Sequence, residues 1–260
     1  PTGWTLFLTG AALTVVFTAL GLLIAVLQRD RAKAVGIGLV AWVMMVIVYD
    51  GLLLWIMFSF SDRPIEPEAT ALLVVDVQNL EIAPPIEREH PAFVADLRTR
   101  VVPNIACLIA ACRQAGIEVI YTVIESLTRD GRDRSLDHKL SGILVPKGAW
   151  EGRVIDAVAP RDDDIVLPKT SSGVFNSTNV DYVLRNLGVR HLLVVGLLTD
   201  QCVDMAVRDG ADRGYYTICI SDCCSTYTEA RQTNALQAFS GYCRTVTLAA
   251  MLAEIALAAK

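Results

Sequence analysis

The stretch RHLLVVGLLTDQCVDMAV, residues 190–207, decides the fold of the larger part of this chain. It begins as a continuous apolar run, becomes polar at Thr199 and Asp200, and continues past Cys202 with a helical pattern. A continuous Val/Leu run is typical of a strand that is covered on both faces, as in a parallel sheet between helices. We therefore expect a buried strand that ends at an edge of the sheet, with Cys202 on the first turn of the next helix.

The same alternation of short apolar runs and longer helical stretches begins at Ala71 and continues over the rest of the chain. The apolar runs predict five strands, over residues 71–76, 116–124, 163–169, 190–196 and 215–220. Helical patterns cover about residues 93–114, 179–187 and 229–239, besides the one after Cys202. Strands of this type that alternate with helices predict a three-layer α/β domain, with a parallel sheet between two layers of helices.

The segment from Glu125 to Trp150 is an exception, because it is rich in charged residues and has no clear period. Long irregular connections in compact domains are often lids or binding loops. A solvated surface insertion fits this composition equally well. Both interpretations therefore stay open at this point.

The first part of the chain has a different composition. No charged residue occurs from Trp4 to Leu27, and a second apolar run, Ala34 to Phe60, is interrupted only by Asp50. About 20 apolar residues are enough to cross a bilayer as a helix, and two such runs fit a signal peptide poorly. We expect a hairpin of two transmembrane helices over residues 1–62, a folded domain over residues 63–260, and hence an integral membrane protein.

The predicted hairpin also bears on partners and orientation. A carboxylate such as that of Asp50 is costly inside a bilayer, so it is expected to face protein or water, and a membrane protein partner is one hypothesis. Arg29, Arg31 and Lys33 favour a cytoplasmic turn between the two helices, which would place both ends of the hairpin, and the domain, on the outer side. A nucleophilic cysteine among many others suits a reducing compartment, which would place the domain on the cytoplasmic side instead. The side of the membrane on which the domain lies therefore stays open.

The net charge and the spacing of the cysteines argue against a nucleic-acid-binding protein and against a zinc site. The net charge is −5, and no basic stripe with interleaved aromatic residues occurs, so nucleic acid is not an expected partner. The seven cysteines form no CxxC or Cys/His spacing typical of zinc. We expect neither a metal nor another cofactor.

Polar residues stand at the ends of three predicted strands. Asp76 ends the first, Lys169 ends the third, and Cys202 follows the fourth. Ligands of parallel sheets bind beyond the carboxyl ends of the strands, so these side chains are expected to meet there. A helix N-terminus and a nearby lysine would stabilise the thiolate of Cys202, and the N–H groups of that turn could bind an oxyanion. The pattern therefore indicates a nucleophilic cysteine with an acid and a cation.

Three segments carry a resemblance to a known family. LLVVDVQN (72–79), LPKTSSGVFNSTNVDYVLRNLGV (167–189) and VVGLLTDQCVDMAVRDGADRGYYTICISDCCST (194–226) together resemble the isochorismatase-like cysteine hydrolases. The resemblance implies a largely parallel six-stranded sheet and a catalytic triad of Asp76, Lys169 and Cys202. It also implies a non-proline cis peptide between Leu197 and Leu198. The oxyanion donors would be the backbone N–H groups of Leu198 and Cys202.

The resemblance further narrows the expected reaction. Family members that split the vinyl ether of isochorismate generally lack the cysteine, so Cys202 favours hydrolysis of amide, ureido or carbamoyl compounds through a thioester. Nicotinamidases of this branch bind a metal through an Asp-x-His pair, which His90, His138 and His191 do not form. The stretch IESLTRDGRDRS (124–135) is similar to the ureidoacrylate- and biuret-hydrolase side of the family.

Two further expectations complete the resemblance. Four residues are candidates for binding the small amide or ureide substrate: Gln78, Asn79, Glu125 and Arg129. The family tends to form homo-oligomers, which we expect here too.

The alternative to an enzyme is a catalytically idle accessory subunit of a membrane protein complex. An intact set of Asp76, Lys169 and Cys202 argues against that alternative.

Overall fold

The computed structural model describes residues 63–258, and residues from Pro64 onward form one compact unit. Across this described range, no helix combines the length and the apolar character that a bilayer crossing requires. The hairpin predicted over residues 1–62 lies outside the described residues.

The strands are β1 (Thr70–Val75), β2 (Glu118–Ile124), β3 (Ile165–Lys169), β4 (His191–Leu197), β5 (Tyr216–Ser225) and β6 (Arg244–Val246). The helices are α3 (Pro84–Glu89), α4 (Pro91–Asp96), α5 (Val102–Gln114), α6 (Leu136–Leu140), α7 (Val174–Ser177), α8 (Val180–Asn186), α9 (Asp204–Asp212), α10 (Glu229–Ala238) and α11 (Leu248–Ala258). Short 3₁₀ turns occur at Pro67–Ala69, Asn79–Ile82, Trp150–Gly152 and Asp156–Val158, and π-type turns at Leu97–Val101 and Thr199–Val203.

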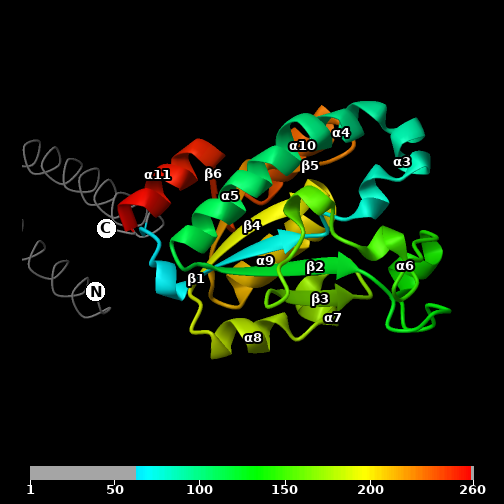
Figure 1. The fold of residues 1–260 in the computed structure, drawn as a ribbon, viewed down its shortest axis with the longest axis horizontal. Helices are drawn as coiled ribbons and strands as arrows, with labels where there is room; N and C mark the ends of the chain where they lie inside the picture. Colours follow the sequence, from blue (N-terminus) through cyan, green and yellow to red (C-terminus); the bar gives the residue numbers. More distant parts are fainter. Residues whose placement is uncertain (1–62, 259–260) are drawn as a thin grey trace, which may run out of the picture. The chain divides into compact units, whose positions relative to one another are not determined.

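The strands form one six-stranded sheet in the order β3-β2-β1-β4-β5-β6, and every neighbouring pair is parallel. In Figure 1, α5 and α11 lie on one side of this sheet, and α7 and α8 lie on the other. The prediction of a three-layer α/β domain with a largely parallel six-stranded sheet is confirmed.

Strand β1 shows why the predicted strands are continuously apolar. All six of its residues are buried. Leu72 and Val74 belong to the core under α5 and α11, whereas Leu73 and Val75 belong to the core under α7, α8 and α9. Successive side chains of a strand point to opposite faces, so a strand with helices on both sides needs apolar residues at every position.

The chain changes direction across the sheet between β1 and β4, which are neighbours although β2 and β3 lie between them in sequence. Gly196 of β4 pairs with Val75 of β1 and has a φ of 121°. A Cβ atom at Gly196 would lie 2.0 Å from the carbonyl oxygen of Val75. Only glycine lets the two strands approach this closely at their carboxyl ends.

The elements differ from the sequence predictions in three respects. The helical stretch 93–114 is divided into α4 and α5 by the π-type turn Leu97–Val101. Strand β5 continues through Ser225, so Cys223 and Cys224 lie within the strand and are completely buried. The apolar pattern predicted neither α11 nor the three-residue strand β6, although the family resemblance implied a sixth strand.

Candidate active site

The structure brings together the three residues that the sequence placed at strand ends. Asp76 directly follows β1 and has a left-handed φ of 52°, which aspartate tolerates better than most residues. Lys169 is the last residue of β3, and Cys202 lies in the π-type turn that leads into α9. Lys169 Nζ is 2.8 Å from Asp76 Oδ2 and 3.4 Å from Cys202 Sγ. The lysine therefore joins the carboxylate to the sulfur.

Neighbouring groups hold Asp76 and Lys169 in place. The Thr122 hydroxyl donates a 2.9 Å hydrogen bond to Asp76 Oδ1 from the neighbouring strand β2. Lys169 Nζ also donates to the backbone carbonyl oxygens of Ser171 and Ser172, at 2.9 and 3.3 Å. The exposed fractions of Asp76 and Lys169 are only 1% and 0%. Each charge is thus compensated within the protein rather than by water.

The ammonium of Lys169 stays charged in this environment. Burial opposes the charge, but the Asp76 carboxylate and Cys202 outweigh burial, so the pKa of Lys169 is raised. A charged lysine beside the sulfur can stabilise negative charge that develops there.

The resting state of Cys202 differs from the sequence expectation. Burial and the nearby Asp76 carboxylate raise the pKa of the Cys202 thiol to about 12, although Lys169 acts in the opposite direction. Lys169 thus acts in the expected direction, but burial and Asp76 outweigh it, so the net shift is opposite to the expectation. Cys202 is a neutral thiol until a base removes its proton, and Asp76 is the adjacent carboxylate that can do so.

A cavity of about 260 Å³ opens in front of Asp76 and Cys202. Its lining residues come from the ends of β1, β2 and β4 and from the segments that follow the strands: Asp76, Leu80, Glu81, Ile86, Ile124, Gly142, Ile143, Leu144, Val145, Leu197, Leu198, Gln201, Cys202 and Tyr227. Apolar walls with a few polar groups are typical of small-molecule sites at the switch point of a parallel sheet.

The loop between β4 and α9 has the features expected for an oxyanion site. The peptide bond between Leu197 and Leu198 is cis, which confirms that prediction. The Leu198 carbonyl accepts the N–H groups of Gln201 and Val203, at 3.0 and 3.2 Å, so this turn is closed on itself. Leu198 and Cys202 both line the cavity. The role of their backbone N–H groups as oxyanion donors stays a prediction.

Gln78 and Asn79 lie beside the cavity and hold loops in place. The Gln78 side chain is completely buried, exchanges hydrogen bonds with the backbone of Ile124, and donates to the carbonyl of Glu151 at 3.0 Å. Asn79 Nδ2 donates to the carbonyl of Trp150 at 3.1 Å. The residues that line the cavity include neither Gln78 nor Asn79. Their contacts fasten the turn at Trp150 and Glu151 against the end of β1.

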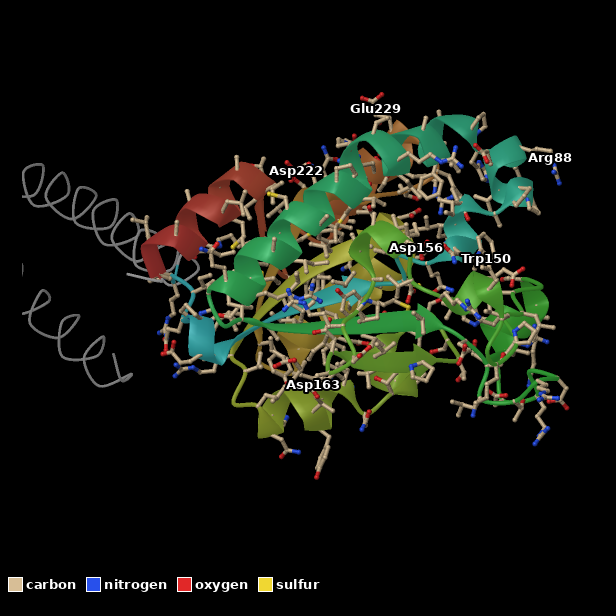
Figure 2. The ribbon with its side chains drawn as sticks, viewed as in Figure 1. Arg88, Trp150, Asp156, Asp163, Asp222 and Glu229 are labelled. Atoms are coloured by element: carbon tan, nitrogen blue, oxygen red, sulfur yellow. The ribbon has the colours of Figure 1, made fainter. Side chains whose placement is uncertain are left out.

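Glu125 and Arg129 begin the charged segment that the sequence left open. Glu125 Oε2 accepts the backbone N–H of Gly148 at 3.0 Å, whereas Arg129 is exposed, and neither residue lines the cavity. Their role in substrate binding, like that of Gln78 and Asn79, stays a prediction. Residues 142–145 of the same segment form one wall of the cavity, and Figure 2 shows Trp150 beside the carboxyl ends of the strands. This segment is thus a wall of the site rather than a detached insertion.

The sequence analysis missed Glu81, which lies in the 3₁₀ turn after β1 and lines the cavity. Its side chain is buried, and Oε2 has no hydrogen-bond partner within residues 63–258. Burial and the Asp76 carboxylate raise the pKa of Glu81 to about 7, against a smaller opposing effect of Lys169. The only sequence signal was a carboxylate five positions after Asp76 in a loop, which is not distinctive.

The three histidines lie in separate places. His90 stacks on the Tyr227 ring with 3.9 Å between ring centroids, His138 is buried in α6, and His191 is buried at the start of β4. Burial lowers the pKa of both His138 and His191, so these two imidazoles are neutral near pH 7. These separate positions agree with structural roles for the three histidines.

Comparison with known proteins identifies the family. Residues 70–251 match the isochorismatase domain. A cysteine hydrolase from Pseudomonas syringae pv. phaseolicola 1448A is 28% identical, with a TM-score of 0.68 over 75% of this chain and 96% of that protein. An isochorismatase family protein from Desulfovibrio vulgaris is 25% identical, with a TM-score of 0.63 over 72% of this chain and 98% of that protein.

The fold is also shared with the N-carbamoylsarcosine amidase from Thermoplasma acidophilum. That protein is 24% identical, with a TM-score of 0.57, and the similarity covers 69% of this chain and 96% of the amidase. The domain match includes every strand of the sheet together with Asp76, Lys169 and Cys202. The chain therefore belongs to the isochorismatase family.

Proposed function

We propose that this domain hydrolyses a C–N bond of a small amide, ureido or carbamoyl compound through a thioester on Cys202. The chain is a hydrolase acting on C–N bonds, in keeping with its family and its similarity to a cysteine hydrolase. The observation that carries the proposal is the contact of Lys169 with both Asp76 and Cys202 at one end of the cavity. A nucleophile, a base and a cation at one cavity are the groups that covalent hydrolysis requires.

The first half of the reaction forms the thioester. Asp76 takes the proton of the Cys202 thiol while Lys169, hydrogen-bonded to Sγ, stabilises the developing negative charge. The sulfur attacks the carbonyl carbon, a C–S bond forms, and the N–H groups of Leu198 and Cys202 bind the oxyanion. Asp76 then gives its proton to the leaving nitrogen, the C–N bond breaks, and ammonia or an amine departs.

The second half regenerates the enzyme. Asp76 takes a proton from water, the hydroxide attacks the thioester carbon, and the same backbone N–H groups bind the second oxyanion. The C–S bond then breaks, the acid is released, and the Asp76 proton returns to Cys202. Asp76 is a weak base, but it suffices here because Lys169 stabilises the Cys202 thiolate as the proton leaves the sulfur.

Cavity size and relatives support a small substrate. A cavity of about 260 Å³ with apolar walls accepts a small molecule rather than a polypeptide. The N-carbamoylsarcosine amidase among the structural relatives supports a carbamoyl or ureido group as the reacting part.

We propose in addition that residues 1–62 anchor the hydrolase in a lipid bilayer. Two runs of the length that a bilayer requires, Trp4 to Leu27 and Ala34 to Phe60, support the anchor. Asp50 supports a membrane protein partner, since an intramembrane carboxylate is stabilised by protein contacts. A homo-oligomer is also part of this proposal, on the strength of the family resemblance.

The test uses the full chain in detergent and measures ammonia release from a panel of small amides and ureides. We expect Cys202→Ser to lower turnover by about a thousandfold or more, since the thioester can no longer form. Cys107→Ser is the matched control, because Cys107 is exposed on α5 and does not line the cavity. Turnover that survives Cys202→Ser would refute the thioester. No turnover by the unmodified chain, together with an inert Cys202, would favour the idle accessory subunit.

A further inference from the structure

Glu81 is a carboxyl group in the cavity that the proposed reaction does not use. It shares the cavity with Asp76 and Cys202, and its exposed fraction is only 7%. Asp76 is paired with Lys169 and hydrogen-bonded to Thr122, but Glu81 Oε2 has no partner among the residues that the structure describes. A buried carboxyl oxygen without a partner is costly for the fold, and a hydrogen-bond donor bound in the cavity would compensate it.

The charges around the cavity indicate the kind of group that fits. Of the described residues that line it, Asp76 and Glu81 carry carboxyl groups, and none is a lysine, arginine or histidine. The ammonium of Lys169 lies behind the lining and is already in contact with Asp76 and Cys202. A carboxylate on the substrate would therefore meet negative charge without a cation to bind it, whereas a substrate cation would find an unpaired acceptor.

Arg231, an arginine on the Tyr227 side of the cavity, is already engaged in other contacts. Arg231 forms an ion pair with Asp200, and its guanidinium lies over the Tyr227 ring at 5.2 Å from the centroid. The raised pKa of Tyr227, which is caused by burial and then by Glu81, is consistent with carboxyl charge near that ring. This side of the cavity thus offers the Glu81 carboxyl, whose Oε2 is unpaired among the described residues, as an anionic group for a ligand.

We infer that Glu81 selects the substrate, which is a small amide or ureide with a protonated amine at the end away from the scissile bond. This inference rests on the proposed function. The amine binds the Glu81 carboxylate, and the apolar walls from Leu80, Ile124 and Leu144 contact the aliphatic part between the two ends. Charge-assisted hydrogen bonds of this kind are stronger than neutral ones, so the site prefers a substrate with an ammonium group over a neutral one. Substrates with a carboxylate at the same end are excluded.

The protonation of Glu81 fits this role. With a pKa raised to about 7 by burial and Asp76, Glu81 is only partly charged in the empty cavity near neutral pH. A bound ammonium favours the charged form, since an opposite charge at close range lowers the pKa of a carboxyl group. The groups that influence Glu81 are Asp76, Lys169 and Tyr227.

The first experiment compares three amides of similar length with the full chain: 4-aminobutanamide, pentanamide and succinamate. We expect kcat/KM to be highest for the cationic amide and lowest for the anionic one. Glu81→Gln should reduce the ratio of kcat/KM for the cationic amide to kcat/KM for the neutral amide by about tenfold or more. Glu229→Gln is the control, since Glu229 is an exposed carboxylate at the start of α10, away from the cavity (Figure 2).

The second experiment reads the charge selectivity of the cavity without turnover. Cationic 2-aminoethyl and anionic 2-sulfonatoethyl methanethiosulfonate are reacted with the full chain, and modification of Cys202 is followed by mass spectrometry, with exposed Cys107 as the internal reference. We expect the ratio of cationic to anionic rates at Cys202 to fall about tenfold in Glu81→Gln and to persist in Glu81→Asp.

The two experiments separate the two proposals. If no amide is hydrolysed but the ratio at Cys202 depends on Glu81, the proposed reaction fails and the inferred selection of a cation stands. If amides are hydrolysed but neither the substrate preference nor the labelling ratio changes in Glu81→Gln, the inference about Glu81 is overturned and the hydrolase proposal stands.

Discussion

At the scale of single residues, the buried ion pair of Lys169 and Asp76 links stability to reactivity. Replacing Lys169 with methionine leaves the Asp76 carboxylate buried without its cation, which should lower the free energy of unfolding by about 3–5 kcal/mol. Adding Asp76→Asn removes the uncompensated charge, so the double variant should regain most of that loss while turnover stays absent. Urea unfolding of residues 63–260 measures both effects. A double variant that is no more stable than Lys169→Met would contradict the ion-pair explanation.

Glu81 makes a second prediction at this scale, on the dependence of stability on pH. Because burial and Asp76 raise the pKa of Glu81 from 4.5 to about 7, the folded state holds its proton more tightly than the unfolded chain does. The resulting contribution to stability is fully present below pH 4.5 and is lost as pH rises through about 7.

Glu81→Gln removes this loss, because the amide stays neutral at every pH. The variant should therefore gain stability relative to the unmodified domain between pH 5 and pH 8, by about 2 kcal/mol. Thermal unfolding across that pH range measures the difference, with exposed Glu68 replaced by glutamine as the control. A difference between Glu81→Gln and the unmodified domain that does not change with pH would exclude a raised pKa for Glu81.

The sequence placed individual residues well where they stand at strand ends. Asp76, Lys169 and Cys202 were predicted to meet because the carboxyl ends of parallel strands share one edge, and they do meet. The resting state of the Cys202 thiol was predicted wrongly, because the depth of burial depends on the packing of distant segments. Glu81 was missed for the same reason, since an acidic residue in a loop is usually exposed.

At the scale of elements, the junction of β1 and β4 depends on one glycine. Gly196→Ala would place a Cβ atom 2.0 Å from the backbone oxygen of Val75, at a φ of 121° that other residues rarely adopt. We expect the domain to lose more than about 4 kcal/mol of stability or to remain unfolded. Gly188→Ala is the matched control: Gly188 has a φ of 71° with no atom within 4 Å, so its cost should be about 1 kcal/mol. Equal costs, measured by urea unfolding, would show that the crowding at Gly196 is unimportant.

How well the sequence predicted each strand depended on the length of the strand and on how completely its residues are buried. Strands β1 to β4 were located to within two residues, because continuous burial on both faces leaves a long apolar signal. The three residues of β6 are too few for a period, and the family resemblance rather than the pattern implied a sixth strand. The function of the segment from Glu125 to Trp150 could not be predicted, since Gln78 and Asn79 fasten it through backbone carbonyls that any sequence offers.

At the scale of the whole molecule, the family domain occupies the part of the chain that begins at residue 70. The family match begins at residue 70, and the solved relatives from P. syringae and D. vulgaris are covered over 96% and 98% of their lengths by about three quarters of this chain. The sheet, the candidate triad and the cavity all lie within residues 70–246. Residues 1–62 thus precede the part of the chain that matches the family domain.

The last prediction concerns that segment. If residues 1–62 form a hairpin across the bilayer, the full chain should stay in the membrane pellet after washing with alkaline carbonate and dissolve only in detergent. Residues 63–260 expressed alone should remain in the supernatant and release ammonia from the same amides at a similar kcat, since the described residues that line the cavity run from Asp76 to Tyr227. A full chain that carbonate extracts would be bound only at the surface, and the hairpin would be wrong. A shortened chain that stays folded but loses turnover would instead mean that the membrane segment, or a partner recruited through Asp50, acts on the site.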